Sequence, residues 1–228
     1  IHAGDAESIT GSSTSATFQQ SLGAGGQNAT GEGTGTTKKV QSGILYWLRG
    51  FFIAQYTQSH FRWRNDDGSE VTATWGASED AQLINVSAWT VKRLRFLVSN
   101  EGWTRGAAPA FTLEVAQTAT CSGGSYAAVP TDYSGHWHIA TSTNITDAEA
   151  TTNVASGLTD ENVTFVAGQA KDTGNTTGTV TLESDKFTEI EFSVLATGNA
   201  TADPPYCFRV TNSGATSGTG YGFVYSQY

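Results

Sequence analysis

The chain contains no methionine, only two cysteines and four prolines, and only 14% of its 228 residues are charged. The absence of Met predicts that an N-terminal segment, such as a secretory signal, has been removed. Lys and Arg number 12 against 21 Asp and Glu, which gives a net charge of −9. Because phosphate contacts require clustered basic side chains, this balance disfavours nucleic acid and anionic membranes as partners.

No apolar run is long enough to cross a membrane. The densest one, Ile44 to Ala54, is interrupted by Arg49 and Gly50, whereas a spanning helix needs about 20 apolar residues. Apolar residues at a 3.6-residue period, bounded by capping residues, are missing as well. These absences argue against a membrane span and a helical fold, and they leave short strands joined by tight turns.

Catalytic and cofactor motifs are also missing. The sequence holds no Gly-x-Ser-x-Gly nucleophile elbow, and its cysteines belong to no CxxC or Cys/His metal pattern. His136 and His138 have the spacing of some zinc and copper ligands, but no third ligand is evident, and a solvent-facing pair is the alternative. Asp66, Asp67 and Glu70 form either a turn or a calcium site. We expect no enzyme activity, no catalytic residue and no cofactor.

The residues that are abundant, Gly, Ser and Thr, favour an extracellular protein. Six Asn-x-Ser/Thr sequons occur, more than chance predicts, although Thr-rich turns generate sequons freely. Their acceptors, which predict covalent N-glycans, are Asn28, Asn85, Asn144, Asn162, Asn175 and Asn199. Cys121 and Cys207 are expected to form a disulfide that closes a long loop and stabilises the fold by roughly 4 kcal/mol, the alternative being two buried thiols. A secreted or cell-surface protein fits both features.

Residues 1–43 form a polar arm rich in Gly and Thr. Their few large apolar side chains cannot build a core. A Thr-Gly-x-x-Thr-x-x-Thr pattern that begins at Thr10 recurs at Thr30, and it predicts short strands near 14–21 and 34–43 unless the low complexity is coincidental. Because such a strand pair is marginal by itself, we expect the arm to be extended or to lie on a neighbouring molecule.

Residues 44–228 are expected to form one β-sandwich domain. The run Ile44–Ala54 is typical of a strand that is covered on both faces. Gln58–Arg64, a turn at Asn65–Gly68 and a return strand at Val71–Trp75 predict a hairpin. Further strands are predicted at Val91–Ser99, Phe111–Val115, Trp137–Ile139, Val163–Val166, Thr179–Leu182, Phe187–Leu195, Tyr206–Val210 and Tyr221–Tyr228.

The strand pattern predicts an all-β fold, an antiparallel β-sandwich of immunoglobulin-like or jelly-roll-like type with an extended N-terminal arm. Within Phe187–Leu195, Glu189 and Glu191 alternate with core residues and are expected to face water. Leu94–Gly102 followed by Phe111–Val115 resembles adhesion-type immunoglobulin-like sandwiches of prokaryotic surface proteins, in which an apolar strand ends in an Asn-x-Gly turn. The segment RWRNDDGSEVTATW is similar to stretches of uncharacterised secreted bacterial proteins. The resemblance spans roughly residues 58–210 and implies a surface β-sandwich without an activity.

A polar arm, a very apolar strand and many strand edges favour polymerisation. An unpaired edge accepts a strand from another chain, and head-to-tail contacts of that kind propagate into fibres. We therefore expect a structural subunit of an extracellular filament or surface layer, similar in outline to donor-strand filament subunits, with a second copy of the chain as its partner. The candidate interface residues are Phe18, Leu22, Ile44, Leu45, Tyr46, Trp47, Leu48, Phe51, Phe52 and Ile53.

Two alternatives remain open. The donor strand lies within residues 1–55, either in the arm or in the apolar run, and Tyr221–Tyr228 is a third candidate. The function from another class is a carbohydrate-binding or adhesive surface module. It rests on Trp75, Trp89 and Trp103, which lie at or near predicted strand ends where their rings can stack on sugars.

Overall fold

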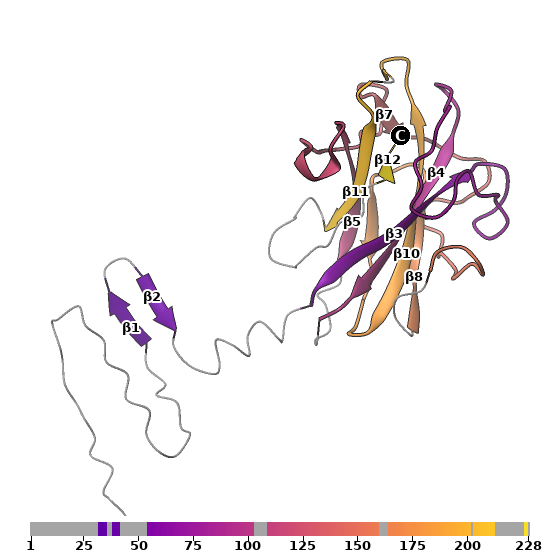
Figure 1. Ribbon diagram of the computed structural model, residues 1–228. Helices are drawn as coiled ribbons and strands as arrows, with labels where there is room; N and C mark the ends of the chain where they lie inside the picture. The colour runs from indigo at the N-terminus through magenta and orange to yellow at the C-terminus, as the bar shows by residue number, and fades with distance from the viewer. Residues whose placement is uncertain are drawn as a thin grey trace, which may run out of the picture. The chain divides into compact units, whose positions relative to one another are not determined.

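The computed structural model describes residues 32–35, 38–41, 54–102, 109–159, 164–201, 203–212 and 226–227 (Figure 1). The chain divides into two compact units, Ile1–Leu48 and Arg49–Tyr228. In the first unit, β1 (Glu32–Gly35) and β2 (Lys38–Gln41) form an antiparallel hairpin in which Gly35 lies opposite Lys38. The strand expected near 34–43 is therefore confirmed only over Lys38–Gln41, and residues 34 and 35 belong to the strand paired with it. The strand expected near 14–21 lies outside the described residues.

The second unit contains two β-sheets, and the expected all-β, antiparallel fold is confirmed. The first sheet contains β3 (Tyr56–Asn65), β4 (Lys92–Asn100), β7 (Trp137–Ile139), β8 (Thr164–Lys171) and β10 (Lys186–Ala196). The second sheet contains β5 (Ala110–Gln117), β6 (Ala127–Ala128), β9 (Thr176–Thr179), β11 (Tyr206–Asn212) and β12 (Ser226–Gln227). A short 3-10 helix, η1 (Cys121–Gly123), follows β5.

In each sheet one edge is a single strand and the other is shared by two strands. The first sheet runs β3-β4-β10, and both β7 and β8 pair along the far edge of β10. The second runs β12-β11-β5, and both β6 and β9 pair along the far edge of β5. Among the pairs of described strands, β8 and β10 alone are parallel. Their register shifts beside Gly168, where a Cβ would lie 2.1 Å from the carbonyl oxygen of Glu189, so that position excludes a side chain.

The hydrophobic core lies between the two sheets and follows the alternation along each strand. Its strand residues include Phe61, Trp63, Leu94, Phe96, Val98, Phe111, Leu113, Ile190, Phe192, Val194, Tyr206, Phe208 and Val210. Trp63 and Trp137 of the first sheet meet Phe208 of the second edge-on, with ring centroids 5.4 and 5.1 Å apart. Each such buried side chain stabilises the fold by about 2–3 kcal/mol, so these contacts hold the sheets together.

The return strand expected at Val71–Trp75 is wrong. β3 pairs with β4 over its length, and residues 66–75 form a loop in which Trp75 makes an isolated bridge to Arg64. The carbonyl oxygens of Glu70 and Ala73 in this loop accept hydrogen bonds from the Arg64 guanidinium at 2.5 and 3.0 Å. The loop therefore bonds to an arginine side chain of β3 instead of forming a ladder along it.

Two further strands differ from expectation in their limits. β9 ends at Thr179, so the strand expected at Thr179–Leu182 is displaced toward the N-terminus, and Val180 and Leu182 enter the core outside a strand. The terminal strand expected at Tyr221–Tyr228 is described at Ser226–Gln227, which pairs with β11. In the part of the chain that the structure describes, no helix has the length and apolar composition needed to cross a membrane.

The expected disulfide is confirmed. Cys121 in η1 bonds to Cys207 on β11, with their Cα atoms 5.5 Å apart and a sequence separation of 86. The bond ties η1, which follows β5, to β11, which lies between β12 and β5 in the second sheet. Such a bond persists in an oxidising compartment, which is compatible with an extracellular protein.

Candidate functional site

The outer face of the first sheet carries buried charges. Side chains that alternate away from the core on β3, β4 and β10, together with one from the loop 66–75, form a buried ionic cluster. Its members are Arg64, Glu70, Arg93, Arg95, Glu189 and Glu191. The expectation that Glu189 and Glu191 face water is wrong, because both are fully buried. They point away from the core as expected, but loops cover that face.

Glu191 lies at the centre of the buried ionic cluster. Its Oε2 accepts hydrogen bonds from Arg64 and Arg95, both at 2.9 Å, and its Oε1 lies 3.1 Å from Nη1 of Arg93. Burial opposes ionisation of Glu191, but Arg95, Arg64 and Arg93 outweigh it and lower the pKa of this carboxyl group. Glu189 accepts from Nε of Arg95. Glu191 is therefore charged and paired in a site whose side chains are closed to water.

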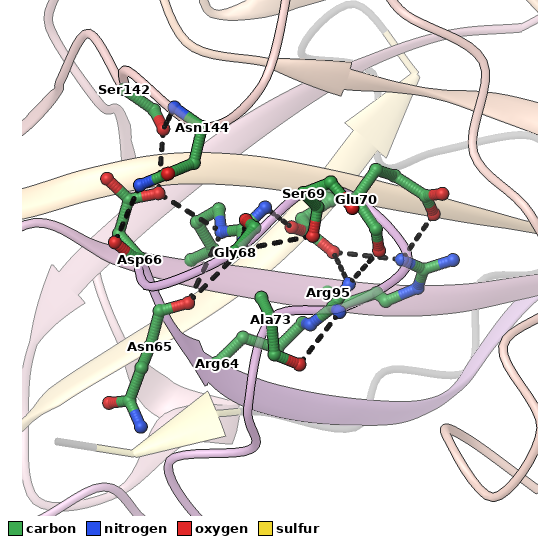
Figure 2. A network of polar contacts seen from close by, with 12 residues as sticks. Arg64, Asn65, Asp66, Gly68, Ser69, Glu70, Ala73, Arg95, Ser142 and Asn144 are labelled. Atoms are coloured by element: carbon green, nitrogen blue, oxygen red, sulfur yellow. Dashed lines mark hydrogen bonds and ion pairs between the residues drawn. The ribbon is translucent and has the colours of Figure 1, made fainter.

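Glu70 links the cluster to the two loops that cover it, and Figure 2 shows its side chain beside that of Arg95. Its Oε1 accepts from Nη1 of Arg95 at 2.7 Å and from the backbone N–H of Thr152 at 3.0 Å. Its Oε2 accepts from the Thr152 hydroxyl at 2.9 Å. The hydroxyl of Thr151 donates to the Glu189 carbonyl at 2.6 Å. These bonds attach the loop 66–75 and the loop around Thr152 to the sheet. The role of the cluster is therefore structural.

The three carboxylates proposed as a turn or a calcium site have separate partners. Oδ1 of Asp66 accepts from the Ser142 hydroxyl at 2.7 Å, and Figure 2 shows Asn144 beside the same aspartate. Asp67 accepts from the backbone N–H and hydroxyl of Thr74 at 2.8 and 2.5 Å, and these bonds lower the pKa of Asp67. With Glu70 in the buried ionic cluster, the geometry favours the turn.

His138 in β7 and His136, which precedes β7, do not form a shared metal site. His136 is exposed, and its Nδ1 lies 2.8 Å from the hydroxyl of Tyr206. His138 is only 5% exposed, so the solvent-facing pair is wrong for this residue. The ring of Tyr133 covers it, with centroids 4.3 Å apart.

One group of metal-binding side chains does converge within the described ranges. Donor atoms of His60, Glu79 and Asp80 lie within 4.8 Å of one another, a donor set that suits a zinc-type ion. His60 Nδ1 lies 2.7 Å from Asp80, while both oxygens of Glu79 accept hydrogen bonds from Thr159. These hydrogen bonds explain why the three side chains lie together without a metal ion, because they connect β3 to two loops.

The tryptophans proposed for sugar stacking have different environments. Trp75 is half-buried, with the guanidinium groups of Arg62 and Arg64 at 4.4 and 4.7 Å from its ring. Trp89 is 59% exposed and lies beside Tyr133, which is 61% exposed, with ring centroids 5.6 Å apart. We call these two side chains the aromatic platform. Trp103 lies outside the described residues, and no sequence pattern pointed to Tyr133.

The glycosylation candidates divide by exposure. Asn85 and Asn199 are exposed, whereas Asn144 and Asn175 are half-buried. Asn28 and Asn162 lie outside the described residues. So do all the candidate interface residues, namely Phe18, Leu22, Ile44, Leu45, Tyr46, Trp47, Leu48, Phe51, Phe52 and Ile53.

Among the described strands, β11 has an edge that bears on strand addition. β12 pairs with β11 at Cys207 and Phe208. Two residues on, the backbone N–H of Val210 donates to Oε1 of Gln58, a fully buried side chain of β3, at 2.9 Å. We call the line where β3 and β11 meet through this bond the seam. At the seam the Gln58 side chain accepts the hydrogen bond that the backbone of a neighbouring strand would otherwise accept from Val210.

Searches of protein-family models, of curated proteins and of solved structures found no match to this chain. Function therefore has to be inferred from the geometry of the seam, the buried ionic cluster and the aromatic platform.

Proposed function

We propose that the protein is a structural subunit of an extracellular filament or surface layer, which polymerises head-to-tail by β-strand addition. The observation that carries the proposal is the edge of β11. Its inner face, which includes Tyr206, Phe208 and Val210, is buried in the core. Its backbone beyond the two residues paired with β12 bonds to the side chain of Gln58. An added strand would pair with β11 through its backbone in place of this side-chain bond.

The other edges of the sandwich offer less to an incoming strand. The far edge of β10 is taken by β7 and β8, and that of β5 by β6 and β9. Along β3, the carbonyl oxygens of Phe61 and Trp63 already accept from the backbone N–H groups of Asp80 and Gly76 at 2.9 and 2.8 Å. These bonds already use main-chain groups of β3, and strand addition requires main-chain groups with which an incoming strand can pair.

The donor strand comes from residues 1–55 of a second copy. The apolar run Ile44–Ala54 supplies side chains for a hydrophobic groove, and the polar arm supplies reach. A contact between different surfaces of identical chains is heterologous, and it propagates into a fibre when the rotation does not close. The disulfide between Cys121 and Cys207 joins β11 to η1 and so strengthens the acceptor strand against the pull of its neighbour.

The test is negative-stain electron microscopy of the purified full chain, which is expected to show fibres. Val210 donates away from β5, and alternation along the strand places the N–H of Asn212 on the same side. Asn212→Pro removes that donor, whereas Asn212→Ala keeps it and removes only the side chain. We expect the alanine variant to polymerise and the proline variant to remain in small particles.

Three results would count against this assignment. Fibres from Asn212→Pro as abundant as those from Asn212→Ala would place the acceptor elsewhere. A variant without residues 1–43 that still polymerises would exclude the arm as the donor. If the full chain gives only monodisperse particles at all concentrations, the filament function itself is refuted.

The second candidate is a carbohydrate-binding or adhesive surface module. Its specific support is the exposure of Trp89, since an exposed aromatic ring face stacks on sugars. A glycan screen in which binding disappears on Trp89→Asn would favour it over the filament. Trp75 is a poorer candidate, because two arginines lie over its ring.

A further inference from the structure

The aromatic platform lies beside an exposed glycosylation sequon. The carboxamide nitrogen of Asn199 lies 3.5 Å from the carbonyl oxygen of Tyr133. Its neighbour Gly198 abuts the other ring, because a Cβ built there would lie 3.4 Å from Trp89. A sugar attached to Asn199 therefore begins within reach of both rings.

The two half-buried sequons, Asn144 and Asn175, use their side-chain amide nitrogens in hydrogen bonds to backbone carbonyl groups. Nδ2 of Asn175 donates to the carbonyl oxygens of Leu113 and Val129, at 2.9 and 2.6 Å. Nδ2 of Asn144 donates to the carbonyl oxygen of Asp66 at 2.8 Å. A glycan replaces one hydrogen of this nitrogen, so at Asn175 it would break a bond to a part-buried carbonyl group. At Asn199 the one bond from this nitrogen, to the Tyr133 carbonyl oxygen, is long and exposed, so the remaining hydrogen or water can satisfy that oxygen at little cost.

The backbone holds Trp89 in its exposed position. Its φ of 65° lies in the left-handed region, which is uncommon for a bulky residue and is maintained only by surrounding structure. Here its N–H donates to the carbonyl oxygen of Ala196, at the end of β10, at 2.8 Å. Two large aromatic side chains that are more than half exposed, side by side, indicate a surface that binds something.

A polar group without a partner lies under the platform. Both ring nitrogens of His138 lack a hydrogen-bond partner among the described residues, although the side chain is 95% buried. Its ring contacts that of Tyr133 at 4.3 Å. Buried polar atoms are nearly always satisfied, and ordered water is a common partner for them. Above this imidazole, the two exposed rings offer a surface on which the C–H face of a sugar can pack.

We propose that Asn199 carries an N-glycan whose first sugar ring packs on Trp89 and Tyr133. The occupant of the aromatic platform is then the chain's own glycan. The inference is independent of strand addition. It competes with the carbohydrate-binding alternative, because a platform covered from within is closed to a free sugar.

The test uses the full chain secreted from a host that glycosylates Asn-x-Ser/Thr, with glycopeptide mapping and thermal unfolding. Asn199→Gln removes this glycan and Asn85→Gln is the matched control. We expect occupancy at Asn199 and a loss of about 2–4 °C in the unfolding midpoint for Asn199→Gln, with no loss for Asn85→Gln. Acrylamide quenching of tryptophan fluorescence should rise when the Asn199 glycan is absent, since it uncovers Trp89.

Trp89→Asn separates packing from a general effect of glycosylation, because Asn tolerates the left-handed backbone. In that variant, removing the Asn199 glycan should no longer change the midpoint. An unoccupied Asn199, or an equal effect of the glycan with and without Trp89, overturns the proposal. So does binding of free oligosaccharides by the glycosylated wild-type protein that is lost on Trp89→Asn, because the platform would then be open.

Discussion

Glu191→Gln is expected to be the most destabilising single change in the outer face of the first sheet. Glutamine keeps the size of the side chain and still accepts a hydrogen bond, but it removes the charge that faces Arg64, Arg93 and Arg95 at 2.9, 3.1 and 2.9 Å. All four side chains are fully buried. Removing one partner of a buried ionic network leaves uncompensated charge, which costs about 3–5 kcal/mol. That loss is a large part of the stability of an ordinary domain.

The loss should also depend on pH in a defined direction. Burial raises the pKa of Glu191, but Arg95, Arg64 and Arg93 outweigh it, so the folded pKa lies below the ordinary value of 4.5. The contribution of this group to stability is therefore complete above pH 4.5 and disappears as the pH falls through the lowered folded pKa. The unfolding curves of wild type and Glu191→Gln should converge in acid.

The assay is urea unfolding followed by tryptophan fluorescence, for which the buried Trp63 and Trp137 are probes. Glu183→Gln is the control, because Glu183 is exposed and pairs with half-buried Lys186 at 3.3 Å. A surface pair of this kind contributes at most about 1 kcal/mol. If Glu191→Gln costs no more than the control at pH 7, the buried ionic cluster does not lock the loops to the sheet.

The remaining predictions concern two aspartates and the disulfide. Asp147→Asn should lower the free energy of unfolding by about 1 kcal/mol at pH 7, a value discounted for its partial exposure. Burial raises the pKa of Asp147, but hydrogen bonds, above all from Lys171, lower it to about 2, so this stability is lost between pH 3.8 and 2 in an acid titration. Asp172→Asn should instead stabilise by about 0.5–1 kcal/mol at pH 7 in urea, because burial raises the pKa of Asp172 and its Oδ1 has no partner among the described residues. This gain should vanish below pH 3.8, and a loss at pH 7 would contradict it. Replacing Cys121 and Cys207 by Ser should cost up to about 4.5 kcal/mol in the same assay, given the separation of 86 residues, and a cost under about 1 kcal/mol would be inconsistent with loop closure.

The sequence was sufficient to predict which side chains of a strand face the core, and to predict that its two cysteines form a disulfide. In Val91–Ser99, apolar residues at every second position predicted that Leu94, Phe96 and Val98 face the core, and all three do. Two cysteines without a metal pattern predicted the bond between Cys121 and Cys207. Both inferences use short-range rules that hold whatever the other strands do.

The buried ionic cluster could not be predicted in the same way. Alternation shows that Arg95 and Glu191 point away from the core, but the pattern is identical for a face in water and a face under loops. Only the register, in which Glu191 lies opposite Arg95 on the neighbouring strand, brings the charges together. The return strand at Val71–Trp75 was wrong for the same reason, because the arginines that bind that loop come partly from β4.

The aromatic platform and the seam depend on contacts distant in sequence. Tyr133 and Trp89 meet although 44 positions separate them, and Gln58 reaches Val210 across the core from the other sheet. No local sequence pattern predicts either of these residue pairs. The nearest to such a pattern is Gln58 itself, because a glutamine in a buried strand needs a hydrogen-bond partner for its carboxamide.

Stability and assembly should be separable in this fold, because they depend on different residues. The outer face of the first sheet is closed by the buried ionic cluster, and an added strand at the seam touches none of its charges. Glu191→Gln should therefore unfold more easily yet form fibres wherever it remains folded. Asn212→Pro should unfold in urea like Asn212→Ala, because the N–H that it removes points away from β5, and should still fail to form fibres. A proline variant that loses stability and fibres together would show that the edge of β11 is part of the folded body and not an acceptor for a second chain.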